Sequence, residues 1–217
     1  MTGLDPTAGH EAVRRMVVGI TGATGIIFGV RLLQALRSLG IETHLVVSKA
    51  ADMTRAYETS FGAGDIRALA DFVYSPQDIG APIASGSFKT MGMIVAPCSI
   101  RTLSDIAHGV TSGLISRAAD VALKERRRLV LLVRETPLHA GHLKSMLAVS
   151  EMGGIIAPPV PAFYTKPTSV EDIVAHTIGR ALDLFDIDLN SFPRWGGPHA
   201  TWAAVERDVS AITDEAE

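Results

Sequence analysis

A charged pair follows one of the most apolar runs of the chain. Arg134 and Glu135 come directly after five aliphatic residues at 129–133, where a buried strand is expected to end. Burying such charges without a partner is costly, so an anionic ligand is the natural partner for Arg134. Glu135 could move a proton beside it. A purely structural ion pair between the two residues is the alternative.

A glycine-rich turn near the N-terminus could hold a phosphate. Residues 16–29, MVVGITGATGIIFG, indicate a strand, a turn and the start of a helix, where backbone N–H groups can bind such a group. The glycines stand at positions 19, 22, 25 and 29, and Phe28 occupies the place where a dinucleotide-binding pattern would continue with glycine. The glycines could instead serve only tight strand–helix packing.

The end of the second expected strand favours a mononucleotide over a dinucleotide. That strand ends in Ser48 and Lys49, with no acidic residue for a ribose 2′-hydroxyl, and the chain has no Tyr-x-x-x-Lys pair. A mononucleotide such as FMN needs only a phosphate site and a flat slot. The sequence therefore favours FMN over a nicotinamide cofactor, although Ser48 could be only the N-cap of the next helix.

Two more segments carry polar side chains at element ends. In residues 96–103, APCSIRTL, Ser99 and Thr102 could either cap a helix or bind a ligand, and Cys98 is expected to be a small buried residue. In the basic run at 124–128, Arg126 and Arg127 are expected to be solvated charges that complement a helix dipole.

The elements that must position these residues alternate along the chain. Apolar spacing predicts helices over 26–39, 49–59, 103–108, 114–124, 143–152 and 170–185, and strands over 16–18, 43–47, 91–96, 129–133 and 155–156. This order predicts an α/β fold with a single doubly wound, mostly parallel sheet and helices on both faces, Rossmann or flavodoxin-like. In such sheets ligands bind at the carboxyl ends of the strands, which here are residues 21–25, Ser48, residues 97–102 and residues 134–135.

The overall composition sets further limits. A chain of 217 residues with 47% hydrophobic residues suits one domain, expected at 14–197, with a lead-in at 1–13 and a tail at 198–217. A net charge of −3 favours neither nucleic acid nor an anionic membrane as a partner. One cysteine fits a reducing cytoplasm, and no apolar run approaches the ~18 residues of a membrane span.

In sequence and in order along the chain, the motifs resemble those of the flavin prenyltransferase family, the partners of prenylated-flavin-dependent decarboxylases. The matching segments are TGATG, LVVSKAA, Glu58-Thr59, ASGSF, APCSIRTL, RAADVALKERR, LVRETPL, AFYTKP, SVEDIV with Arg180, and PRW ending at Trp195. The resemblance is closest to the branch associated with hydroxyarylic acid decarboxylases. Val133 departs from the proline usual before Arg-Glu, and Thr24 replaces the commoner serine.

The resemblance implies a metal-independent enzyme that assembles as a homododecamer. It would transfer a dimethylallyl group from dimethylallyl monophosphate to N5 and C6 of reduced FMN. The product, prenylated FMN, would then serve a partner UbiD-type decarboxylase. Two alternatives remain open, an FMN-binding accessory subunit and a flavin-dependent decarboxylase in its own right. The latter would need a catalytic histidine early in the chain, and His44 lies within an expected strand.

The resemblance also implies site residues, part of them from neighbouring subunits. FMN would contact Gly22, Ala23, Thr24, Ser48, Ser99, Ile100, Arg101, Thr102 and Arg134. The prenyl phosphate would be held by Ser85, Arg117, Lys124, Tyr164 and Arg180, the last three of which also count as catalytic. Glu58 and Glu135 would move protons, with Trp195 near the prenyl group. From residue type alone, solvated or packing roles are the alternatives for Tyr164, Trp195 and the helical arginines.

Overall fold

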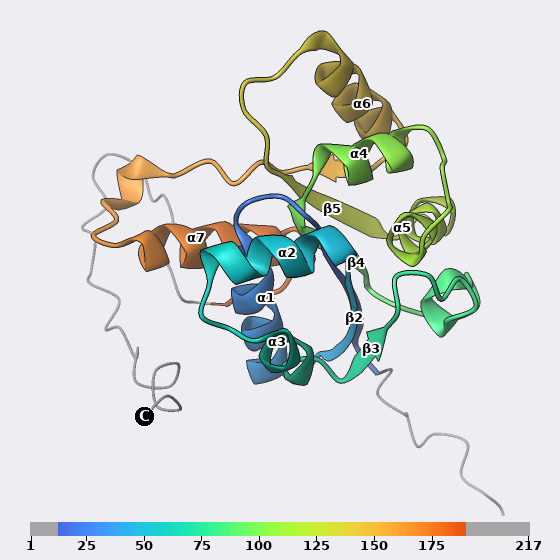
Figure 1. The fold of residues 1–217 in the computed structure, drawn as a ribbon, viewed down its shortest axis with the longest axis horizontal. Coiled ribbons are helices and arrows are strands. Elements are labelled where there is room, and N and C mark those ends of the chain that lie inside the picture. Colours follow the sequence, from blue (N-terminus) through green and yellow to red (C-terminus); the bar gives the residue numbers. More distant parts are fainter. Residues whose placement is uncertain (1–12, 190–217) are drawn as a thin grey trace, which may run out of the picture.

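The fold is built around one six-stranded parallel sheet. The computed structural model describes residues 13–189, so residues 1–12 of the predicted lead-in, the predicted tail and Trp195 lie outside the described residues (Figure 1). The strands are β1 (Arg15–Ile20), β2 (Glu42–Val47), β3 (Phe72–Tyr74), β4 (Gly92–Cys98), β5 (Arg128–Val133) and β6 (Ile155–Ile156). Their order is β3-β2-β1-β4-β5-β6, and every neighbouring pair is parallel. The order reverses between β1 and β4, which is where doubly wound sheets bind ligands.

Helices cover both faces of the sheet, as Figure 1 shows. One layer contains α1 (Ile26–Ser38), α2 (Lys49–Glu58), α3 (Ala63–Ala68) and α7 (Val170–Asp183). The other contains α4 (Ile100–Ala107), α5 (Leu114–Lys124), α6 (Ala140–Glu151) and the short 3₁₀ helix η1 (Pro82–Ala84). A second 3₁₀ helix, η2 (Phe163–Thr165), precedes α7. No helix within 13–189 is long and apolar enough to cross a membrane.

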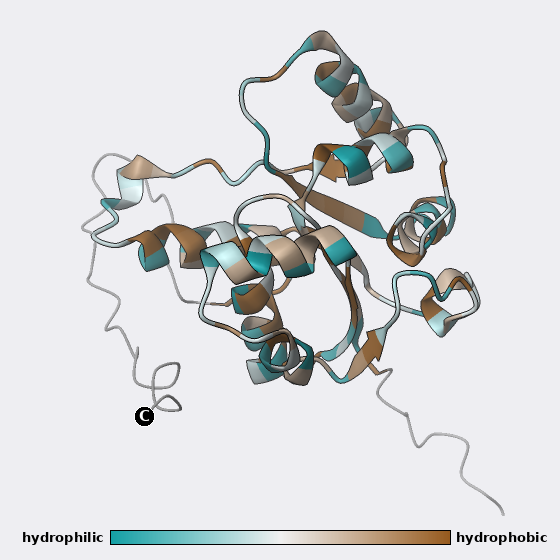
Figure 2. Cartoon of the chain, in the orientation of Figure 1, coloured by the Kyte–Doolittle hydropathy of each residue, from teal (hydrophilic) through white to brown (hydrophobic). Residues whose placement is uncertain are grey.

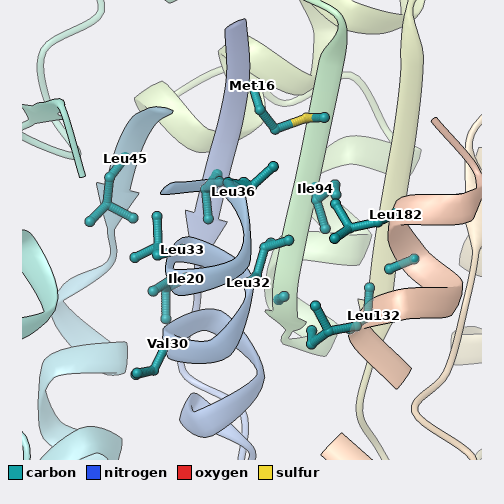
Figure 3. Packing of buried hydrophobic residues seen from close by; sticks show 14 of the residues in the cluster. Met16, Ile20, Val30, Leu32, Leu33, Leu36, Leu45, Ile94, Leu132 and Leu182 are labelled. Carbon is teal, nitrogen blue, oxygen red and sulfur yellow. The ribbon is translucent and has the colours of Figure 1, made fainter. Parts of the chain in front are cut away.

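Alternation along the strands divides the core into two layers. Met16, Val18 and Ile20 of β1 face the α1 and α7 layer, whereas Val17 faces the opposite one. Figure 3 shows Leu32 of α1 and Leu182 of α7 packed near Ile94 and Leu132 of the sheet. Both faces are therefore apolar, and β5 is brown along most of its length in Figure 2.

The structure confirms the predicted fold and refines its boundaries. The described sheet is wholly parallel rather than mostly parallel. The strand predicted to end at residue 96 continues through Pro97 to Cys98, and the short helix α3 lies in a region that the sequence left unassigned. Cys98 is fully buried as expected, and burial raises the pKa of its thiol, which disfavours the reactive thiolate.

Candidate functional site

A buried threonine joins the strand ends at the point where the strand order reverses. The hydroxyl of Thr21 donates a hydrogen bond of 2.9 Å to the carbonyl of Pro97 and accepts one of 2.7 Å from the backbone N–H of Ser99. The next strand is tied in as well, since the N–H of Arg134 donates to the carbonyl of Cys98 at 3.1 Å. These bonds bring the carboxyl ends of β1, β4 and β5 together at one edge, called here the carboxyl edge.

Three helices begin at the carboxyl edge. Helix α1 starts after Gly25, and α2 and α4 are capped by the hydroxyls of Ser48 and Ser99. Ser48 accepts a hydrogen bond from the N–H of Ala51 at 3.1 Å, and Ser99 accepts one from Thr102 at 3.3 Å. Both serines thus have the capping role that was one of their two interpretations. The positive ends of three helix dipoles at one edge suit a phosphate.

Packing alone requires two glycines of the opening turn. A Cβ atom at Gly22 would collide with the Cβ of Ala50 in α2, and one at Gly29 would lie 2.6 Å from the carbonyl oxygen of Ala96. Gly25 has a left-handed backbone with a φ of 99° at the N-cap of α1. The tight-packing interpretation therefore holds for Gly22 and Gly29, and their spacing alone does not indicate a phosphate site.

A carboxylate of the protein itself binds the N-terminus of α1. Glu58, the last residue of α2, accepts hydrogen bonds from the N–H groups of Gly25 and Ile26 at 2.8 and 3.0 Å. Those two amides are among the groups that the turn was expected to offer to a phosphate. Glu58 therefore binds the amide of Gly25, next to Thr24 in the chain, and α2 and α4 begin at the same edge with their N-termini capped by Ser48 and Ser99.

The charged pair after β5 lies exposed at the same edge. Arg134 and Glu135 are both solvent-exposed, and Glu135 accepts a hydrogen bond from the N–H of Thr136 at 2.9 Å. Neither side chain forms a salt bridge with another residue in the described range 13–189. The ion pair that was the alternative interpretation does not form between them, and both side chains are accessible to a ligand in the single chain.

The remaining predicted residues gather elsewhere. Lys124 ends α5 four residues before β5 begins, so it lies at the opposite edge of the sheet, called here the amino edge, and its ammonium is 3.2 Å from Glu125. Arg117 donates to the carbonyl of Ala84 at 3.3 Å and pairs with Asp120 at 3.1 Å. The hydroxyl of Ser85 lies 2.9 Å from that of Ser87. These three predicted residues thus lie along α5 and the loop beside it.

Helix α7 carries the last members of the predicted set toward the amino edge. Arg180, in its last turn, pairs with Asp183 at 2.6 Å, and Asp186 just beyond pairs with Arg128 at the start of β5. Tyr164 contacts the same helix, with its hydroxyl 3.4 Å from Nε2 of His176. Burial, reinforced by the charge of Arg180, lowers the pKa of His176 below its ordinary value.

The predicted residues therefore form two groups within one chain. Six-residue strands at ~3.3 Å per residue separate the two edges by about 20 Å. The carboxyl edge carries Gly22, Ala23, Thr24, Ser48, Glu58, Ser99, Ile100, Arg101, Thr102, Arg134 and Glu135, whereas Ser85, Lys124 and Arg180 lie toward the amino edge. Arg117, in the first turn of α5, and Tyr164, which precedes α7, are not at the amino edge. One chain by itself does not bring these groups into a single site.

Arg127 corrects one prediction. Its guanidinium donates hydrogen bonds of 2.6 and 2.7 Å to the carbonyls of Gly86 and Phe88, so it is not the solvated charge that was expected. Arg126 is exposed, as predicted. The basic run gave no signal that separates the two arginines, because the partners of Arg127 lie about forty positions earlier in the chain.

His44 is built into the sheet. It is buried within β2, where its Nδ1 lies 2.9 Å from the hydroxyl of Tyr74 and its Nε2 lies 2.9 Å from Glu42. Burial lowers its pKa below the ordinary value. It pairs with Val17 and Phe72 inside the sheet, away from the carboxyl edge, so it does not supply the early catalytic histidine of a decarboxylase.

Comparison with known proteins gives a consistent result. The family model described as "Flavoprotein" matches residues 5–182. A relative from Neisseria meningitidis, "Flavin prenyltransferase UbiX", is 57% identical over 185 residues, covering 85% of this chain and 98% of the relative. The relative of the same name from Escherichia coli K12 is 55% identical, covering 85% of this chain and all of the relative.

Two similar solved structures agree with these sequence relatives. AnUbiX (PadA1), in complex with FMN and dimethylallyl pyrophosphate, is 55% identical with a TM-score of 0.84, covering 85% of this chain and 98% of that one. A dodecameric FMN-dependent UbiX-like decarboxylase from Escherichia coli O157:H7 is 53% identical with a TM-score of 0.83, covering 84% and 100%.

Proposed function

This chain belongs to the flavin prenyltransferase family, and on that basis we propose that it transfers a dimethylallyl group from dimethylallyl monophosphate to N5 and C6 of reduced FMN. One structural observation carries the proposal furthest. The carboxyl edge presents helix N-termini together with the exposed guanidinium of Arg134, which is the donor set that a mononucleotide phosphate needs. The FMN-bound relative supports this choice of acceptor.

The proposed roles at the carboxyl edge follow from position. The N-termini of α2 and α4, with Ser48 and Ser99 to Thr102, hold the FMN phosphate. Gly22, Ala23 and Thr24 line the flavin. Glu58, fixed beside Thr24 by the amides of α1, moves a proton on one side, and the exposed Glu135 does so on the other. FMN supplies the nucleophilic N5 and C6 atoms that receive the prenyl group.

The second group of residues suits the prenyl donor. Cleavage of an allylic C–O bond builds negative charge on the leaving phosphate, which Lys124, Arg117 and Arg180 stabilise in the proposed site. Ser85 and Tyr164 donate hydrogen bonds to the same oxygens. In the isolated chain the cations pair with Glu125, Asp120 and Asp183, and the proposal requires the phosphate to compete with these carboxylates.

We propose that the complete site forms between subunits. The flavin group at the carboxyl edge of one chain faces Lys124 and Arg180 of a neighbouring chain, because these two residues lie toward the opposite edge of the sheet, about 20 Å away, within a chain. The dodecameric relative supports an assembly in which such edges meet. Trp195, proposed to flank the prenyl group, lies outside the described residues.

The fate of the product completes the proposal. Prenylated FMN passes to a UbiD-type decarboxylase in the cytoplasm, and no metal takes part. The relative bound to dimethylallyl pyrophosphate suggests this pyrophosphate as a second prenyl donor. Both the monophosphate and the pyrophosphate therefore belong in the assay. Full activity in the presence of excess chelator is the expected result.

The direct test is a mass measurement. Purified protein is incubated anaerobically with reduced FMN and dimethylallyl monophosphate, and the flavin is then analysed by mass spectrometry. The expected product carries one added prenyl group. An unchanged flavin mass would contradict the proposal and favour an accessory FMN-binding subunit. Conversion of an added carboxylic acid without a partner enzyme would favour a decarboxylase.

A further inference from the structure

The loop at residues 85–88, called here the SGSF loop, depends on contacts from outside itself. Within the loop, the N–H of Phe88 donates to the carbonyl of Ser85 at 3.2 Å, and the hydroxyls of Ser85 and Ser87 lie 2.9 Å apart. The carbonyls of Gly86 and Phe88 bind Arg127, which directly precedes β5 at the amino edge of the sheet. What fixes this loop therefore fixes the position of Ser85.

One guanidinium spans the loop. Arg127 donates through Nη2 to the carbonyl of Gly86 at 2.6 Å and through Nη1 to that of Phe88 at 2.7 Å. The two carbonyls are two residues apart, which suits the rigid planar fork of arginine, whereas the single ammonium of lysine is poorly suited to hold both. Arg127 is part-buried, so water competes less for these bonds than at the exposed Arg126.

Neighbouring contacts connect the SGSF loop to the environment of Lys124. A Cβ atom at Gly86 would collide with the carboxylate of Glu125, the residue that pairs with Lys124. The ring of Phe88 lies against the guanidinium of Arg15 at 5.0 Å and edge-on to His44 at 5.0 Å. Moving the loop would thus displace Ser85 and the partner of Lys124 together.

We propose that Arg127 is a positioning residue, which clamps the SGSF loop so that Ser85 and Lys124 are presented together to the phosphate of the prenyl donor. The role in donor binding rests on the proposed function, whereas the clamping of the loop by Arg127 does not. Within residues 13–189 the guanidinium of Arg127 donates its hydrogen bonds to backbone carbonyls. Its loss therefore affects donor binding through the loop and leaves the flavin group, at the other edge of the sheet, unchanged.

The experiment compares Arg127→Met and Arg127→Lys with the matched control Arg126→Met, which removes the adjacent exposed charge. Hydrogen exchange measured at the Phe88 amide is expected to accelerate at least about tenfold in Arg127→Met, since charge-assisted hydrogen bonds hold the loop. Steady-state assays are expected to show KM for dimethylallyl monophosphate raised about tenfold, with FMN affinity unchanged. Arg127→Lys should fall between wild type and Arg127→Met, and Arg126→Met should match wild type.

The two readouts separate the possible failures. Unchanged exchange at Phe88 in both Arg127 variants would overturn the clamp, whatever the activity. Faster exchange with an unaltered KM would show that the clamp does not serve donor binding, and an equal loss of FMN affinity would point to a general structural role. If Arg127→Met does not fold, Arg127→Lys carries the same comparison. Failure of the proposed function differs from all of these, because wild type itself would then form no product.

Discussion

Glu58 illustrates how a single side chain changes the interpretation of a motif. Residues 21–25 resemble a phosphate-binding turn, yet the amides at the start of α1 bind the carboxylate of Glu58. The turn therefore fixes an acidic group next to Thr24, and we propose the N-termini of α2 and α4 for the flavin phosphate.

Glu135→Gln tests the proposed proton transfer. The substitution keeps the size of an exposed side chain but removes its ability to take up a proton. We expect kcat for prenylated FMN formation to fall by roughly 100-fold or more, the usual contribution of a general acid–base group. FMN affinity, followed by quenching of flavin fluorescence, should stay within about twofold, since the phosphate contacts are untouched. A variant with wild-type kcat would remove Glu135 from the mechanism.

Arg180→Ala tests the assignment of the second group. A charged hydrogen bond to phosphate contributes about 1.5–3 kcal/mol, so KM for dimethylallyl monophosphate should rise by roughly 10- to 100-fold. Flavin binding should not change, because Arg180 lies toward the edge opposite the flavin group. Asp183→Asn is the matched control, as it breaks the same ion pair while keeping the arginine. Equal losses of donor and flavin binding would contradict the assignment.

At the scale of the elements, the contact between the opening turn and α2 determines the shape of the carboxyl edge. Gly22 lets α2 approach so closely that a Cβ atom would meet Ala50. This approach also brings Glu58, at the far end of α2, to the start of α1. Helix–turn packing and the position of a proposed catalytic group are thus coupled.

Gly22→Ala should therefore destabilise the protein. Overpacking against the α2 backbone costs about 1–3 kcal/mol, which should appear as a lower midpoint in thermal or urea unfolding. Gly64→Ala is the matched control, because nothing lies within 4 Å of a Cβ atom there and the glycine is in helix α3. The control should be neutral or slightly stabilising. Equal midpoints for the two variants would disprove the packing argument.

The elements could be predicted from sequence where periodicity is strong. The apolar run of β1 and the apolar spacing of α1 predicted both elements within a few residues. Helix α3 was missed because six residues are too few to show a period. The partners of Arg127 and Glu58 were also missed, since they lie about thirty to forty positions away and only the folded chain brings them together.

At the scale of the whole molecule, the length of the sheet strands determines how far apart the two groups of predicted site residues lie. Sequence motifs predict these residues, and their division between opposite edges follows from where α5 and α7 end in the structure. The resemblance implied contributions from neighbouring subunits. The separation of about 20 Å gives a physical reason for that expectation.

Mixing of inactive variants tests the shared site. Arg134→Ala affects the flavin group and Lys124→Ala the phosphate group, and each alone should reduce activity strongly. When both chains are coexpressed, some interfaces pair the intact flavin group of one chain with the intact phosphate group of another. We expect measurable recovery of prenylated FMN formation in the mixed assembly. No recovery in assemblies shown by mass spectrometry to contain both chains would locate the site within one subunit.

The distance between the sheet edges has a further consequence under dilution. If neither group of residues can act without a neighbour, turnover per chain is not a fixed property but depends on protein concentration. Below the dissociation constant of the assembly, specific activity should fall even with saturating substrates, while the fold persists. Added FMN and prenyl phosphate, bound across the interface, should in turn shift the equilibrium toward the assembled state. Substrate binding would then stabilise the association of the chains.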